Sequence, residues 1–258
     1  MAFATVRGNR LSYEDHGAGR PLVFLHGWGT SGRVWDAQVA DLMADHRVIT
    51  LDWRGCGRSD RPATGYSIAE VTLDVLEFLD VMGLERPVLI GSSIAGAFLV
   101  EAALAAPDRL GAIVPVDAGV HHFHGMREHT DRLLADLRTD RAGTLADVVP
   151  QWYRPGASTA RIDRTVREIL DATTLIDALV VDQAGYDPRP RLGGLTVPTH
   201  FLHGELDTEV PLHVPLECTG LIPGARMTVV EGAGHMAQQD RPARFTGALR
   251  HALGAAPR

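Results

Sequence analysis

Segment 88–97, which reads V-L-I-G-S-S-I-A-G-A, constrains the fold of this chain more than any other stretch. Its apolar start predicts the end of a buried strand, and the small residues that follow predict a sharp turn into a helix. Strand and helix pass within contact distance at such a turn, so the positions flanking the apex must be small. Gly91 meets this need before the apex, and Ala95 followed by Gly96 nearly meets it afterwards. The segment therefore predicts a strand, a tight turn with a serine at its apex, and a helix.

The serine at this turn is a candidate nucleophile. A strand–turn–helix unit with the pattern G-x-S-x-G is a nucleophile elbow, which holds the serine hydroxyl exposed on a strained backbone. Gly91 and Ser93 fit the pattern, while Ala95 stands where the second glycine is expected. If Ser92 were the apex, Ile90 would occupy a position that has to be small. We therefore predict Ser93 as the nucleophile.

A serine nucleophile also needs N–H donors for the developing oxyanion. The apolar segment 21–25 predicts a buried strand, and it is followed at once by H-G-W-G at 26–29. Such a turn lets a backbone N–H point into the space above a serine elbow. We predict the backbone amides of Trp28 and Ile94 as the two donors.

The base and the acid that orients it are predicted downstream of the elbow. Asp207 follows a short strand and turn, and His235 lies in a glycine-flanked loop after the strand 227–230. Glycines beside His235 leave its ring free to reach a site. The chain order is Ser93, Asp207, His235, which neither trypsin-like nor subtilisin-like proteases have.

With these motifs the sequence resembles the α/β-hydrolase family over nearly its whole length. Segment 52–60, D-W-R-G-C-G-R-S-D, is similar to the D-x-R-G-x-G-x-S-D loop of that family, where it is a structural turn. The nearest group is that of small esterases, lactonases, carbon–carbon hydrolases and cofactor-free haloperoxidases or perhydrolases. Haloalkane dehalogenases and epoxide hydrolases carry aspartate at the elbow, so Ser93 excludes those branches. The resemblance implies no cofactor.

The predicted fold class is α/β, with a mostly parallel central sheet flanked by helices. Strands expected at 48–52, 88–90 and 112–116 alternate with helices expected at 67–82 and 93–106, after an antiparallel start at 3–7 and 9–14. The resemblance implies a core domain of residues 1–117 and 195–258, with a helical cap at 118–194 inserted after the sixth strand. Helical periodicity at 132–137 and 164–181 agrees with a cap.

The cap is expected to cover the pocket, because substrates bind at the carboxyl ends of the strands in such folds. Phe123, Met126, Trp152 and Tyr153 are the candidate lining residues, with the core of the cap as their alternative place. The H-H-F-H run at 121–124 has histidines at a spacing that two ligands of one ion can have, but no second ligand cluster accompanies it. We therefore predict a polar loop at the pocket rim and no metal.

Two aspartates compete for the role of the acid. Asp207 is favoured, because G-E-L-D matches the family's G-x-x-D loop and V-P follows, whereas Glu205 and Glu209 fall out of that register. Asp117 also follows a strand, and some members of the family draw the acid from after the sixth strand. Its alternative role is to order the start of the cap or to cap a turn.

Composition and charge are those of an ordinary soluble globular protein. The chain has 258 residues, 45% of them hydrophobic, and a net charge of −7, which argues against nucleic acid or an anionic membrane as a partner. The N-terminus shows no signal-peptide pattern, and no apolar run approaches the roughly 20 residues that span a bilayer. Cys56 and Cys218 lack metal or redox spacing, so we expect free thiols and a cytoplasmic location. Composition does not indicate an oligomeric state.

The resemblance and the motifs together predict a serine hydrolase that acts on a small or medium carboxylic ester, thioester or lactone. A carbon–carbon bond hydrolase, a perhydrolase or haloperoxidase, and a cofactor-free oxygenase use the same kind of site. A weakly catalytic small-molecule receptor is an alternative of a different class, since such receptors can keep the triad. Repeated turnover of short p-nitrophenyl esters distinguishes the enzyme from the receptor.

Overall fold

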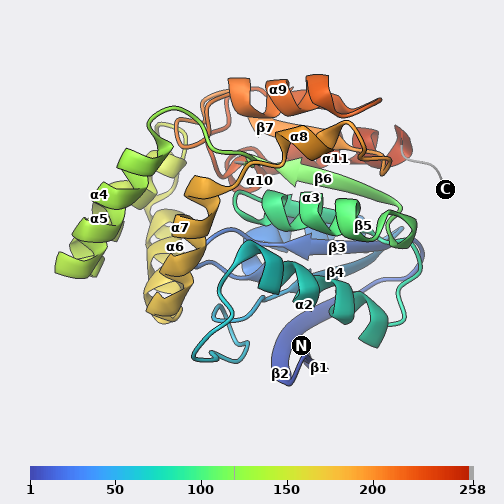
Figure 1. The fold of residues 1–258 in the computed structure, drawn as a ribbon, viewed down its shortest axis with the longest axis horizontal. Coiled ribbons are helices and arrows are strands. Elements are labelled where there is room, and N and C mark those ends of the chain that lie inside the picture. The colour runs from blue at the N-terminus through green and yellow to red at the C-terminus, as the bar shows by residue number, and fades with distance from the viewer. Residues whose placement is uncertain (119, 256–258) are drawn as a thin grey trace.

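The protein is built around one eight-stranded sheet, seen largely face-on in the computed structural model of Figure 1, which describes residues 1–118 and 120–255. The strand order is β1-β2-β4-β3-β5-β6-β7-β8, in which β2 is antiparallel to both of its neighbours, β1 and β4, and the remaining pairs are parallel. The strands are β1 (Ala2–Val6), β2 (Asn9–His16), β3 (Pro21–Leu25), β4 (Arg47–Leu51), β5 (Val88–Ser92), β6 (Ala112–Val116), β7 (His200–Gly204) and β8 (Arg226–Val230). This arrangement confirms the predicted α/β class and the antiparallel start.

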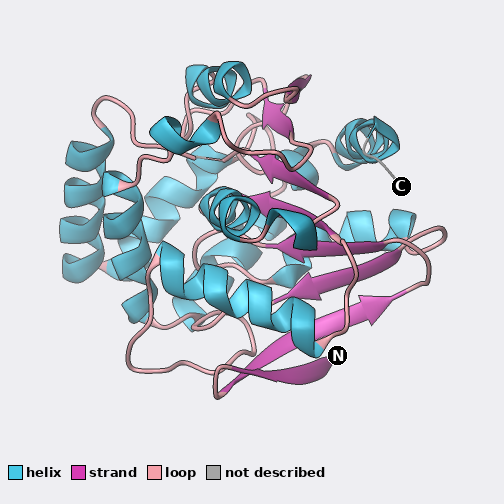
Figure 2. Cartoon of the chain, turned by 45° about the vertical axis from the view of Figure 1, so that its right-hand side comes forward, coloured by secondary structure: helices cyan, strands magenta, loops and turns pink. Residues whose placement is uncertain are grey.

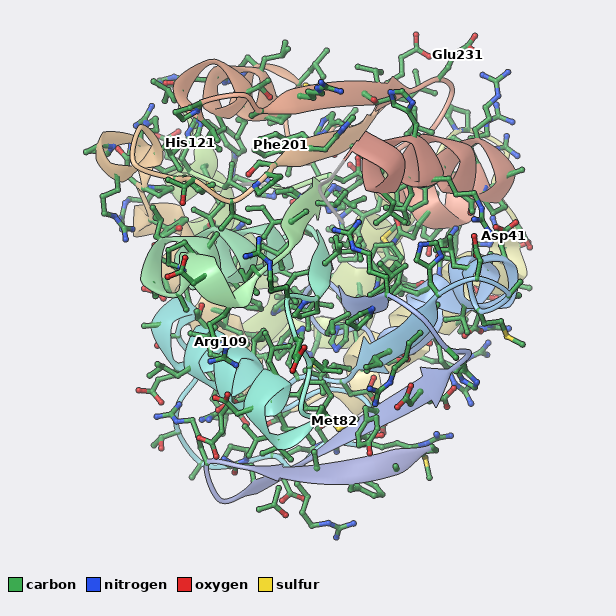
Figure 3. The ribbon with its side chains drawn as sticks, turned by 90° about the vertical axis from the view of Figure 1, so that its right-hand side faces the viewer. Asp41, Met82, Arg109, His121, Phe201 and Glu231 are labelled. Carbon is green, nitrogen blue, oxygen red and sulfur yellow. The ribbon has the colours of Figure 1, made fainter. Side chains whose placement is uncertain are left out.

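Helices cover both faces of the sheet, as predicted for a mainly parallel sheet. In Figure 3 α1, which carries Asp41, lies on one side of the sheet, and Arg109, which follows α3, lies on the other. The helices of the core are α1 (Asp36–Leu42), α2 (Ile68–Val81), α3 (Ala95–Ala105), α9 (His213–Leu221), α10 (Ala237–Asp240) and α11 (Pro242–Ala255). The central strands β5, β6 and β7 are buried along their whole length, which explains the mainly apolar sequences of β5 and β6, whereas β7 also carries His200 and His203.

Helix α2 shows how local sequence sets the bounds of an element. Its N-cap is Ser67, whose Oγ accepts a hydrogen bond from the backbone N–H of Glu70 at 3.2 Å. The Glu70 carboxylate accepts a hydrogen bond from Arg7. The helix ends at Val81, and Gly83 then adopts a φ of 59°, a left-handed conformation that glycine tolerates best.

A second group of helices lies between β6 and β7 in the chain. They are α4 (Met126–Thr139), α5 (Arg141–Val148), α6 (Thr159–Asp171), α7 (Asp177–Gly185) and the short α8 (Arg189–Leu192). Figures 1 and 2 show α4 to α7 gathered at one end of the sheet, whereas α8 lies beside α9. Chain segments that leave β5, β6 and β7 at their carboxyl ends therefore meet these helices.

The periodic segment 164–181 forms two helices rather than one. Helix α6 ends at Asp171, and Ala172 is extended, with φ −69° and ψ 157°. Thr173 then donates its backbone N–H to the carbonyl of Gly55 and accepts the N–H of Leu175 at its Oγ1. Hydrophobic periodicity continues across this break because residues on both sides of it, such as Ile169 and Ile176, are buried.

Within the described ranges, no helix is both long and apolar enough to cross a bilayer.

Candidate active site

Ser93 lies at a strained turn between β5 and α3. Its φ is 56°, a left-handed value that is uncommon for residues other than glycine. Its backbone N–H donates to the carbonyl of Val116 on the neighbouring strand at 2.8 Å, which fixes the turn against the sheet. A Cβ on Gly91 would lie 2.8 Å from Leu99 Cδ1 and 3.1 Å from Ala95 Cβ. The strand and the helix therefore approach as closely as the sequence pattern predicts.

The departure from G-x-S-x-G at Ala95 has a steric explanation. The Ala95 methyl group fits against Gly91, the position that has no side chain of its own. One residue later the space is tighter, since a Cβ on Gly96 would lie 2.3 Å from Ala118 Cβ and 3.2 Å from Val120 Cγ1. The glycine is therefore needed at position 96, where α3 passes the chain leaving β6.

The turn after β3 lies directly over the elbow. A Cβ on Gly27 would be 3.3 Å from Ser93 Cβ and 4.0 Å from Ser93 Oγ. The next residue, Trp28, lines the same cavity as Ser93 and Ile94. Ile94 is the N-cap of α3, so its amide belongs to a helix start, where N–H groups lack partners within the helix and carry the positive end of its dipole. Both predicted oxyanion donors thus lie beside the serine.

His235 and Asp207 form a hydrogen-bonded pair from two loops at the carboxyl ends of β7 and β8. Asp207 Oδ2 lies 2.9 Å from His235 Nδ1, and both side chains are almost completely buried. The other oxygen of Asp207 accepts the backbone N–H groups of Glu209 at 2.8 Å and Val210 at 3.0 Å. These bonds hold the carboxylate in place, and they leave Nε2 of His235 as the ring nitrogen available for proton transfer.

The pair has the electrostatics of an ion pair. Burial lowers the pKa of His235, but the charge and hydrogen bond of Asp207, followed by Asp117 and Glu209, outweigh it and raise that pKa to about 9. Burial raises the pKa of Asp207, but the charge and hydrogen bond of His235, with smaller contributions from His203 and the N–H of Val210, lower it overall. The carboxylate therefore favours the imidazolium form of His235.

Asp117 is close to this pair but bonded to other groups. Its Oδ1 accepts the N–H of Gly204 at 2.6 Å, and its Oδ2 accepts the N–H of Ala237 at 3.2 Å. Burial, and then the charge of Asp207, raise the pKa of Asp117 well above its ordinary value. Its φ of 46° is strained for a non-glycine residue. This carboxyl group ties the end of β7 to the loop of His235, whereas Asp207 is the carboxylate that accepts the hydrogen bond from the His235 ring.

A small cavity of about 70 Å³ contains Ser93 and His235. Its wall combines the elbow, the turn after β3 and side chains from the helices between β6 and β7. The lining residues are Gly27, Trp28, Thr30, Ser92, Ser93, Ile94, Leu133, Trp152, Val180, Gln183, Glu209, His235 and Met236. A larger hollow of about 390 Å³ lies elsewhere, against β2, β4 and α1, and its lining contains none of the predicted catalytic residues.

Of the four predicted lining residues from this region, Trp152 is the one on the cavity wall. Its carbonyl also accepts the N–H of Met236 at 3.1 Å. Tyr153 points to another partner, since its hydroxyl lies 2.6 Å from Gln239 Oε1 and 2.7 Å from Thr165 Oγ1. The tyrosine therefore joins this region to α10 instead of lining the cavity.

Phe123 and Met126 do not line this cavity either, and Met126 takes the alternative place within a buried helix face. The Phe123 ring packs edge-on against His213 of α9, with 6.3 Å between ring centroids, and it borders a separate shallow hollow. Met126 is buried at the start of α4. Helical periodicity identifies a buried face, but it does not say whether that face meets a neighbouring helix or an open cavity.

The histidines of segment 121–124 have separate partners. His121 Nε2 lies 3.5 Å from a carboxylate oxygen of Glu217, whereas His122 Nε2 lies 3.4 Å from Nη2 of Arg189. An arginine beside an imidazole opposes cation binding there. Among the described residues, Asp117, His203 and Asp207 bring possible ligand atoms within 4.8 Å of one another. The oxygens of both carboxylates already accept backbone or His235 N–H groups.

The prediction missed several residues of the wall. Leu133, Val180 and Gln183 come from α4 and α7, where the sequence gives no sign of which face meets the cavity. Thr30 directly follows the H-G-W-G turn, and Glu209 stands two residues after Asp207. Both residues could have been predicted from their closeness to the H-G-W-G turn and to Asp207.

Comparison with known proteins agrees with this geometry. The model of the Alpha/beta hydrolase family matches residues 22–248. The chain is 32% identical to a pimeloyl-(acyl-carrier protein) methyl ester esterase from Edwardsiella ictaluri, over 93% of this chain and 95% of that protein. An esterase structure from Exiguobacterium antarcticum superimposes with a TM-score of 0.93 at 25% identity, covering 98% of this chain and 99% of the other. A bromoperoxidase from Bacillus anthracis gives 0.92 at 26% identity, covering 98% and 99%. The chain belongs to the alpha/beta hydrolase family.

Proposed function

We propose that this protein is a serine hydrolase that cleaves a small carboxylic ester, thioester or lactone through an acyl-enzyme. One observation carries the proposal: a histidine that is joined to a buried aspartate at 2.9 Å lines a small cavity together with a serine held at a φ of 56°. The esterase names of the relative and of the solved structure support the same reaction class.

In this mechanism Ser93 Oγ attacks the substrate carbonyl while Nε2 of His235 takes its proton. Asp207 holds the imidazole through Nδ1 and stabilises the imidazolium that forms. The amides of Trp28 and Ile94 donate to the oxyanion of the tetrahedral intermediate. The imidazolium then protonates the leaving group, and a water activated by His235 attacks the acyl-enzyme and releases the acid. Each step uses only groups of this chain, the substrate and water.

We also propose that residues 118–194 act as a cap over the core formed by residues 1–117 and 195–258. Leu133, Trp152, Val180 and Gln183 from this region supply part of the cavity wall. The bond from the Met236 N–H to the Trp152 carbonyl joins the region to the loop of His235. A cavity of about 70 Å³ favours short acyl groups.

We also propose that the protein is located in the cytoplasm. The buried free thiols Cys56 and Cys218 support it, since a reducing compartment keeps thiols in that state.

The test is the turnover of p-nitrophenyl acetate and butanoate by the wild type and by Ser93→Ala. We expect repeated turnover by the wild type and a loss on the order of 10³-fold or more in the variant, with an unchanged circular dichroism spectrum. A fluorophosphonate probe should label the wild type at Ser93. Labelling at Ser92, or an active alanine variant, would refute the elbow assignment. A single turnover followed by arrest would instead indicate the receptor.

A further inference from the structure

Glu209 places a carboxylate on the wall of the cavity that holds Ser93 and His235. Its backbone N–H donates to Asp207 Oδ1 at 2.8 Å, so its position is tied to that of the proposed catalytic acid. The side chain lines the cavity and is 30% exposed. The proposed mechanism gives this carboxylate no task, although it lies within a few residues of the reacting groups.

The carboxylate of Glu209 carries a negative charge at neutral pH. Burial raises its pKa, but the interaction with His129 and the charge of His235 outweigh that effect and lower the pKa overall. Its Oε1 lies 3.6 Å from Nε2 of His129, on α4. The charge thus bridges the loop after β7 and a helix of the proposed cap.

The other residues of the cavity wall do little to offset the negative charge of Glu209, so a bound acyl group is exposed to it. Six of the lining residues contribute large apolar or aromatic side chains: Trp28, Ile94, Leu133, Trp152, Val180 and Met236. Among the described residues that line the cavity, none is an arginine or a lysine. The one other titratable side chain there is His235, whose charge is matched by Asp207. A free carboxylate on the acyl chain of a substrate would lie near Glu209 in a partly dehydrated space, where charges interact more strongly than in water.

We propose that Glu209 determines the charge of the acyl group that this site accepts. Neutral and cationic acyl groups bind, and acyl groups that carry a free carboxylate are rejected. This inference rests on the proposed hydrolase function and adds a substrate class to it. The pairing with His129 moderates the effect, because a protonated imidazole offsets part of the carboxylate charge.

Two pairs of methyl esters of nearly equal shape test the proposal. Methyl β-alaninate carries an ammonium group where methyl butanoate carries a methyl group, and monomethyl succinate carries a carboxylate where methyl 4-methylpentanoate carries an isopropyl group. For each pair, the ratio of kcat/KM between the charged and the neutral ester is measured in the wild type and in Glu209→Gln. Dividing one ratio by the other cancels intrinsic ester reactivity and any general change in His235.

In Glu209→Gln we expect the succinate ratio to rise, and the β-alaninate ratio to fall, each by about 10- to 100-fold. His129→Gln should move both ratios in the opposite direction, because the carboxylate then lacks its cationic partner. Glu205→Gln is the matched control. It removes the same charge two residues before Asp207, from a carboxylate that is bonded to the N–H of Gly232 and does not line the cavity. Its ratios should equal those of the wild type.

Equal ratios in Glu209→Gln, Glu205→Gln and the wild type would overturn the inference. If Glu209→Gln does not fold, the opposite shift in His129→Gln decides the question, and unchanged ratios there refute it. Failure of the proposed function is recognised separately, as a wild type that hydrolyses neither neutral ester. In that case the charge preference is measured as the Kd of each of the four esters for Ser93→Ala and for the double variant Ser93→Ala/Glu209→Gln. Equal Kd shifts for all four esters would overturn the inference in that case.

Discussion

Replacing Asp207 with asparagine tests the centre of the proposed mechanism. The pKa of His235 is about 9 although burial alone lowers it, and Asp207 is the largest opposing influence. The difference between about 9 and the ordinary 6.5 corresponds to roughly 3 kcal/mol in favour of the imidazolium. The imidazolium forms in the transition state, so above pH 9, where the resting His235 is neutral in both proteins, losing this preference lowers kcat/KM by roughly 300-fold. Loss of the orienting bond to Nδ1 adds to this, and we expect about 10²- to 10⁴-fold in total for Asp207→Asn.

The pH profile carries a second signature of the same change. The mechanism uses neutral His235 as the base, so kcat/KM of the wild type should rise with pH through a midpoint near 9. In Asp207→Asn, burial becomes the leading influence on the pKa of His235, and the midpoint should move well below 9. The assay is kcat/KM for p-nitrophenyl butanoate between about pH 5.5 and 10, corrected for spontaneous hydrolysis, with folding checked at each pH.

Asp117→Asn is the matched comparison. Both oxygens of Asp117 accept backbone N–H groups, from Gly204 and from Ala237, so an asparagine must turn an NH₂ group toward one of those donors. We expect a loss of about 1–3 kcal/mol in the free energy of unfolding, while the pH midpoint falls less than in Asp207→Asn, because Asp207 raises the pKa of His235 more than Asp117 does. If Asp117→Asn were the crippled variant and Asp207→Asn kept both rate and midpoint, the assignment of the acid would be wrong. The oxygenase-like alternative would then gain support.

Further variants test the cavity wall and the elbow. Trp152→Ala should change relative kcat/KM across acetyl, butanoyl and hexanoyl esters, whereas Phe123→Ala should mainly lower the melting temperature, since only Trp152 lies on the wall; the reverse pattern would contradict this assignment. Gly96→Ala should destabilise the protein by about 1–3 kcal/mol in urea unfolding, because the new methyl group would lie 2.3 Å from Ala118 Cβ. Ala95→Gly should cost only about 1 kcal/mol and keep activity, and equal losses in both variants would refute the steric explanation of the elbow.

The sequence by itself determined the strands, the two helices at 67–82 and 93–106, and the elements that carry the candidate triad. These features depend on local patterns. Apolar runs, the cap at Ser67 and the small residues around Ser93 act over a few positions of the chain, and the structure has the corresponding elements within a few residues of their predicted bounds. The strained φ of Ser93 follows from the same local requirement for a tight turn.

Tertiary structure decided which side chains meet. Asp117 and Asp207 both follow strands at the same edge of the sheet. Only the packing of the loops brings Asp207 to the His235 ring and brings Asp117 to two backbone N–H groups. The cavity wall likewise depends on how α4 and α7 lie over the elbow. Helical periodicity predicts a buried face there, but a face packed on a neighbouring helix and a face open to a cavity have the same apolar pattern. Trp152 and Tyr153 are adjacent in the sequence, yet one lines the cavity and the other bonds to Gln239.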